Sequence, residues 1–102
     1  MANSRKIRIS GPAGRDLERI GDYTRREWGE AQKRVYLGEI REALKRLRDM
    51  PGTGVARDDI DEGLRAHPIR KHIIFFRDTE DALTIVRVLH ASMDVKTRLR
   101  RD

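Results

Sequence analysis

The spacing of hydrophobic positions changes along the chain from a period of two to a helical period and back to two. Residues 5–10 alternate charged and apolar side chains, which predicts a half-buried strand. Over residues 12–28 the apolar positions recur every three or four residues, and Ser10 is placed to cap the helix that this spacing predicts. Asp16 and Glu18 lie early enough to complement its dipole. The stripe expected to face the core consists of Ala13, Leu17, Ile20, Thr24 and Trp28.

A second helical pattern follows Gly29 with almost no loop and stops at Pro51. Its apolar positions are Tyr36, Leu37, Ile40, Ala43, Leu44, Leu47 and Met50. Two amphipathic helices joined so closely predict an antiparallel hairpin. Residues 51–63 are rich in glycine and acidic side chains and show no sustained period, so they predict a loop.

The rest of the chain up to His90 has the pattern of strands. Three strand segments are expected, at residues 64–69, 71–77 and 82–90. Pro68 cannot donate a ladder hydrogen bond, so it should place its strand at an edge or end it. Residues 93–102 predict a short helix or a basic tail. The whole chain, residues 1–102, is therefore expected to be one α+β domain of order β-α-α-β-β-β(-α), with a helical hairpin packed on a small, mainly antiparallel sheet.

Both faces of the predicted sheet are apolar. Ile74 and Phe76 should point to one side and Ile73 and Phe75 to the other, because side chains alternate along a strand. Regular alternation in the last strand also places three residues on one face, namely Val86, Val88 and His90. One helical hairpin covers one face, so we expect a partner to cover the second. The alternative cover is the terminal segment, whose large apolar residues are Met93, Val95 and Leu99.

The charge of the chain points to an acidic partner. The net charge is +6 and the pI is about 10.3, and charged residues make up 39% of the 102 residues. Most of the basic residues are arginines, which pair equally well with phosphate and carboxylate, so nucleic acid and an acidic protein both remain open. There is no cysteine, and no apolar run is long enough for a signal peptide or a membrane span. These features predict a soluble cytoplasmic protein that does not bind to membranes.

No catalytic or cofactor-binding motif stands out. The sequence lacks a glycine-rich phosphate loop, a HExxH helix and a nucleophile elbow. His67, His72 and His90 fall on different strands without the spacing of metal ligands. We therefore expect neither a metal nor a cofactor.

A set of basic residues on the three later strands is the strongest candidate for chemistry. It consists of Arg65, Arg70, Lys71, Arg77, Arg87 and His90. Positioned cations and a histidine could stabilise phosphodiester cleavage, with His90 as the general acid or base. A solvated sheet edge, or pairing of Arg87 with a partner's carboxylate, explains the same residues. A regular strand puts Arg87 and His90 on opposite faces unless a bulge intervenes, and both tyrosines lie on the helices, which argues against an enzyme.

Taken in order, these residues resemble the ParE/RelE toxin superfamily over nearly the whole chain, and its ParE branch in particular. The hairpin carries Ala13, Asp16, Leu17, Ile20, Tyr23, Trp28, Gly29, Ile40, Leu44, Leu47 and Pro51. The later strands carry Gly63, Leu64, Arg65, His72, Arg87, Val88, Leu89, His90, Met93 and Asp94. The sequence departs from ParE relatives at Phe75 and Phe76, where a tyrosine is common, and at Ala91, where a glycine is common.

The resemblance implies a plasmid-stabilisation toxin of a type II toxin–antitoxin system, neutralised by a ParD-like antitoxin and able to contact operator DNA only through that antitoxin. It also implies a non-enzymatic inhibitor of DNA gyrase. The alternative is a RelE-like ribosome-dependent mRNA endonuclease, with Arg65, Arg87 and His90 as its catalytic residues. The missing tyrosine beyond the last strand favours gyrase. The residues expected to bind a partner are Arg65, Arg70, Ile74, Phe76, Arg77, Val86, Arg87 and Val88.

Overall fold

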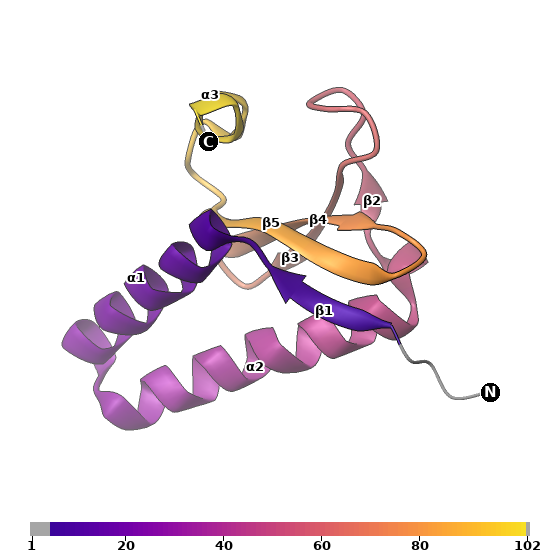
Figure 1. The fold of residues 1–102 in the computed structure, drawn as a ribbon. Coiled ribbons are helices and arrows are strands. Elements are labelled where there is room, and N and C mark those ends of the chain that lie inside the picture. The colour runs from indigo at the N-terminus through magenta and orange to yellow at the C-terminus, as the bar shows by residue number, and fades with distance from the viewer. Residues whose placement is uncertain (1–4, 102) are drawn as a thin grey trace.

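A helical hairpin packs against one face of a small mixed sheet, and a short terminal helix lies on the other side (Figure 1). The computed structural model describes residues 5–101. Its elements are β1 (Lys6–Ile9), α1 (Gly11–Trp28), α2 (Glu30–Asp49), the 3-10 turn η1 (Pro51–Thr53), β2 (Val55–Ala56), β3 (Arg65–Ile69), β4 (His72–Asp78), β5 (Ala82–His90) and α3 (Val95–Arg101). The predicted α+β architecture is confirmed. No helix in the described range is long and apolar enough to cross a membrane.

The sheet has the strand order β1-β5-β4-β3-β2. Only β1 and β5 are parallel, and the other neighbours are antiparallel. The two-residue strand β2 lies in the segment that was expected to be a loop, and it pairs with Arg65 and Ala66 alone. Within residues 5–101, Pro68 therefore has no strand on its outer side, in agreement with the predicted edge position.

Local capping signals set both ends of α1. The Ser10 hydroxyl accepts a hydrogen bond from the Ala13 amide at 3.1 Å, and Gly29 ends the helix with a φ of +95° that favours glycine. Two expectations for this helix are wrong. Asp16 and Glu18 both lie beyond the first turn, so neither acts as a dipole partner, and Asp16 is buried. Trp28 is 70% exposed and does not join the core.

The main core lies between the hairpin and the sheet. The apolar stripe predicted for α2 is largely confirmed, although Met50 is 67% exposed. The buried members of this core are Ala13, Ile20, Tyr36, Ile40, Ala43, Leu44, Leu47, Ile74, Phe76, Leu83, Ile85 and Val88.

A β-bulge at Val86 changes which residues of β5 face this core. Phe76 pairs with Ile85 while Phe75 pairs with Arg87, so Val86 is an extra residue in β5. The bulge reverses the alternation of all residues that follow it. Val88 consequently joins the main core, whereas Val86 packs on the opposite face. The expectation that Val86 and Val88 share a face is therefore wrong.

The chain itself covers the second face of the sheet. A smaller core there consists of Leu64, Ala66, Phe75 and Leu89. Val95 and Leu99 of α3 and Ile60 of the loop before β3 pack against it. The structure thus supports the alternative cover, the terminal segment, rather than a partner as the cover of this face.

Candidate functional site

A buried ion pair joins α1 to β5. Arg87 Nε and an Arg87 terminal nitrogen donate to the two carboxylate oxygens of Asp16 at 2.7 and 2.9 Å, and both side chains are only 6% exposed. The Val88 amide donates to the same carboxylate at 2.9 Å. These contacts raise the pKa of Arg87, mainly through the hydrogen bonds to Asp16.

The topology explains why Asp16 lies at this point. β1 pairs with residues 82–85, so in the described part of the chain the second half of β5 has no strand on that side. The chain turns into α1 at Ser10, whose hydroxyl donates to the Val86 carbonyl at 2.9 Å. The first turns of α1 then run beside the open edge of β5, where the Asp16 carboxylate satisfies the unpaired Val88 amide.

Two histidines that looked unrelated in the sequence are neighbours across the sheet. His72 pairs with His90 in the register of β4 and β5, and their rings stack edge to face with centroids 5.4 Å apart. The Tyr36 hydroxyl lies 2.6 Å from His72 Nδ1. Burial and then the neighbouring His90 lower the pKa of His72, while Asp16 opposes them. The spacing of these residues along the chain does not predict the cluster, because it depends on how β4 and β5 pair.

The structure does not bring all three residues of the alternative nuclease site together. Arg87 and His90 do line one small cavity, contrary to the expectation that they lie apart, but Arg65 does not. Arg65 pairs with Phe76 in β3 and donates to the Gly54 carbonyl at 2.6 Å. His90 lies opposite His72, four residues away along β4, or roughly 13 Å at the rise of a strand. Arg87 is held by Asp16. Among the described residues there is also no group of three or more possible metal ligands.

The residues predicted to bind a partner fall into two groups. Ile74, Phe76 and Val88 are fully or almost fully buried under the hairpin, so they are not available at the surface and that expectation is wrong for them. Arg70 remains accessible, with a 65% exposed side chain that forms a bidentate pair with Glu39. Arg77 donates to the Glu62 carbonyl at 2.8 Å and also pairs with Asp61, while Val86 is half-buried on the second face.

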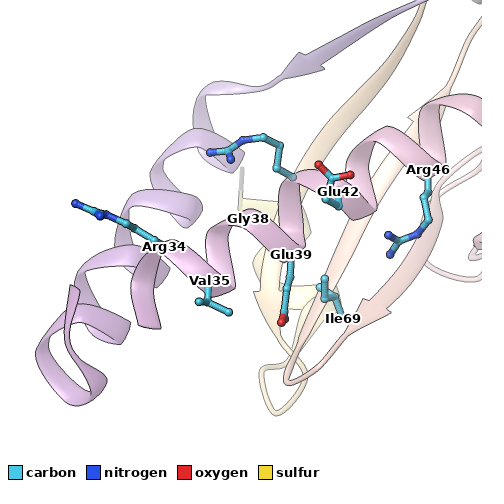
Figure 2. Close-up of a pocket in the computed structure, with 8 residues that line it drawn as sticks. Arg34, Val35, Gly38, Glu39, Glu42, Arg46 and Ile69 are labelled. Atoms are coloured by element: carbon cyan, nitrogen blue, oxygen red, sulfur yellow. The ribbon is translucent and has the colours of Figure 1, made fainter. Parts of the chain in front are cut away.

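A wide groove lies beside α2, where the end of β3 approaches the helix. Its volume is about 590 Å³. Figure 2 shows Val35, Glu39 and Ile69 gathered on one side of α2. The described residues that line it are Arg34, Val35, Gly38, Glu39, Arg41, Glu42, Arg46 and Ile69. The groove therefore combines an apolar floor with charged walls in which arginines outnumber carboxylates.

A much smaller cavity, of about 70 Å³, lies where α1, the end of β5 and α3 meet. We call it the α1–α3 cavity. It is lined by Asp16, Arg19, Ile20, His72, Arg87, Val88, Leu89, His90, Met93 and Arg98. Only one of these residues is acidic, so the lining is strongly cationic.

Residues 7–95 match the family model described as the ParE toxin of the type II toxin–antitoxin system parDE. The chain belongs to the ParE toxin family. It is 38% identical to Toxin ParE1 of Mycobacterium tuberculosis over 97 residues, which covers 94% of this chain and 99% of the relative. It is 37% identical to Toxin ParE of Escherichia coli over 93 residues, covering 89% of each chain, and 30% identical to Toxin ParE1 of Caulobacter vibrioides over 92 residues, covering 90% of this chain and 95% of that one.

The fold agrees with the ParE assignment. A solved structure titled "Chromosomal ParDE TA system from P. aeruginosa" superimposes with a TM-score of 0.74 at 20% sequence identity. The match covers 87% of this chain and 98% of the other. At this identity the likeness concerns the fold alone, and the expected ParE/RelE-like architecture is confirmed by it.

Proposed function

We propose that this ParE-family toxin acts in the cytoplasm by binding and inhibiting DNA gyrase, without being an enzyme, and that a ParD-like antitoxin neutralises it. Family membership supports the toxin role. The observation that carries the non-enzymatic reading is the buried bidentate pair between Arg87 and Asp16.

Phosphodiester cleavage needs cations and a proton carrier around one phosphate. In this chain the Arg87 guanidinium is buried against a carboxylate that already neutralises its charge. Arg65 lies at the opposite end of β4 from His90. A substrate phosphate could not contact all three groups without a rearrangement of the sheet, which favours inhibition by binding over catalysis.

The groove on α2 is the surface that we assign to the antitoxin. Its apolar floor of Val35 and Ile69 suits apolar side chains, and its arginine-rich walls suit carboxylates. The exposed pair of Arg70 and Glu39 borders the groove and offers a further polar contact. A segment with alternating acidic and apolar residues would match this surface in both charge and hydrophobicity.

A gyrase assay tests the proposal. Purified toxin should block supercoiling of relaxed plasmid or accumulate cleaved plasmid, and a ParD-like antitoxin should restore activity. Primer extension on translated mRNA is the opposing measurement. New mRNA ends that disappear in Arg65→Ala and His90→Ala, from a toxin inert toward gyrase, would overturn the proposal in favour of the RelE-like endonuclease. Replacement of Val35 by aspartate should weaken antitoxin binding, whereas Asp22→Asn, on exposed α1 surface, should not.

A further inference from the structure

The α1–α3 cavity has the size of a site for one small ion rather than for a cofactor or a drug-like ligand. Its volume of about 70 Å³ is well below the roughly 300–1,000 Å³ of pockets that hold such ligands. Side chains reach it from α1, from β4 and β5, and from α3, so a bound group would be contacted from several directions. The cavity is therefore large enough for one compact chemical group only.

The charge balance of the cavity favours an anion. Among the described residues of the lining, Asp16 is the only acidic one, and its carboxylate already accepts two hydrogen bonds from Arg87 and one from the Val88 amide. Arg19 is 72% exposed and approaches that carboxylate only to 3.9 Å. Arg98 is also exposed. With Arg87 neutralised by Asp16, Arg19 and Arg98 leave a surplus of positive charge at the opening.

Two further basic residues lie on segments next to those that line the cavity, although neither lines it. Arg15 precedes Arg19 by one helical turn and lies on the same side of α1. The Lys71 backbone lies next to the end of β5, because its carbonyl accepts a hydrogen bond from the Ala91 amide at 2.8 Å. The nearby Asp94 caps α3 through the amide and hydroxyl of Thr97. An extended polyanion could therefore place one group in the cavity and others against the basic surroundings, whereas an isolated carboxylate could fill only the cavity.

We propose that the α1–α3 cavity binds one backbone phosphate of nucleic acid, with Arg19 and Arg98 as its ligands. The binding is sequence-independent because the cavity contacts the phosphate and no base. This site goes beyond the proposed function, since it requires neither gyrase nor an antitoxin, and it involves no cleavage.

The test is the salt dependence of binding to a short duplex DNA of arbitrary sequence. Each phosphate contact contributes about one unit to the slope of log affinity against log salt concentration. Because Arg19 and Arg98 share one phosphate, Arg98→Gln and Arg19→Gln should each lower that slope by up to about one, and the double variant should lower it by no more than about one. Arg41→Gln, which removes an exposed arginine from the α2 groove, is the matched control and should leave the slope closer to that of the native chain. The exposed positions of all three arginines leave the fold intact, which melting curves would verify.

Two further measurements decide the outcome. Inorganic phosphate should shift the ring resonances of His90 in the native chain and not in Arg98→Gln. Equal slopes for Arg98→Gln and Arg41→Gln would overturn the proposal, because the affinity would then reflect net charge alone. Binding of a poly-glutamate peptide that depends on Arg98, without such dependence for DNA, would also overturn it and would assign the cavity to an acidic protein.

Discussion

Replacing Asp16 by asparagine tests the central structural claim, that a buried ion pair holds α1 to β5. The amide keeps the shape of the carboxylate and can still accept the Val88 amide hydrogen bond. It loses the charge that neutralises Arg87, and it can no longer accept two hydrogen bonds from the guanidinium. The variant therefore leaves an uncompensated charge at a position where the arginine side chain is only 6% exposed.

Breaking one side of a buried ion pair costs about 3–5 kcal/mol, because the remaining charge has lost its partner and is shielded from water. A domain of this size has a free energy of unfolding of roughly 5–15 kcal/mol, so Asp16→Asn should remove a large part of it. With a shift of about 4–8 °C for each kcal/mol, the melting temperature should fall by more than about 12 °C.

Urea denaturation of the native chain, Asp16→Asn and Glu39→Gln measures the difference. Glu39 is the matched control because it forms a bidentate pair with Arg70 at 2.5 and 2.9 Å, but at the surface, where the Arg70 side chain is 65% exposed. Water solvates Arg70 when its partner is lost, so the free energy of unfolding of Glu39→Gln should differ little from that of the native chain. The double variant Asp16→Asn with Arg87→Met removes the uncompensated charge and keeps an acceptor for the Val88 amide, so it should recover much of the lost stability. If Asp16→Asn lowered the free energy of unfolding no more than Glu39→Gln does, burial would not strengthen the ion pair between Asp16 and Arg87.

The remaining predictions concern three glycines and one histidine. Gly29→Ala should lower the free energy of unfolding by roughly 1–3 kcal/mol because its φ is +95°, while Gly38→Ala, in open space within α2, should raise it by roughly 0.4–1 kcal/mol; chemical denaturation of the two variants distinguishes these signs. Gly54→Ala should cost roughly 1–3 kcal/mol, since its new Cβ would lie 2.5 Å from Phe76 Cζ, and no loss on denaturation would contradict that clash. The pKa of His72 is lowered from 6.5 by burial, so the folded chain binds fewer protons than the unfolded chain below that pH. Stability should fall as the pH drops through 6.5, and this part of the fall should be missing in His72→Gln when denaturation at pH 7.5 and 5.5 is compared.

The elements that the sequence predicted well are those governed by neighbouring residues. Ser10 and Gly29 bound α1 because a capping hydroxyl and a positive φ act within one turn. The helical period of α2 likewise arises from residues three and four apart. Such signals depend on no distant partner, and the helix bounds could therefore be derived from the sequence.

The face assignment in β5 failed because its apolar residues occupy both parities. Ile85, Val86, Val88 and Leu89 are all apolar, so the hydrophobic pattern fits a regular strand and a bulged strand equally well. The bulge is revealed only by the pairing of β5 with β4. The sequence therefore gave no means of locating it, and the sides of Val86 and Val88 followed from the wrong assumption of regularity.

The contacts that define the candidate site could not be predicted from the sequence either. Asp16 and Arg87 are 71 residues apart in the sequence, and Asp16 looked like an ordinary acidic residue of an early helical turn. The contact between Tyr36 and His72 likewise depends on how α2 lies across the sheet. Residue types were visible in the sequence, whereas their partners depended on the register and on the packing of the layers.

The position of Arg87 connects these observations. The bulge places Arg87 opposite Phe75, on the side of the sheet that α3 covers, while its guanidinium reaches Asp16 of α1 around the open edge of β5. A terminal nitrogen also approaches the Arg98 carbonyl of α3 at 3.4 Å. One side chain thus ties both helical layers to the strand between them. Because its charge is matched by Asp16 in this role, any anion that enters the adjoining cavity must be held by the more exposed arginines of α1 and α3.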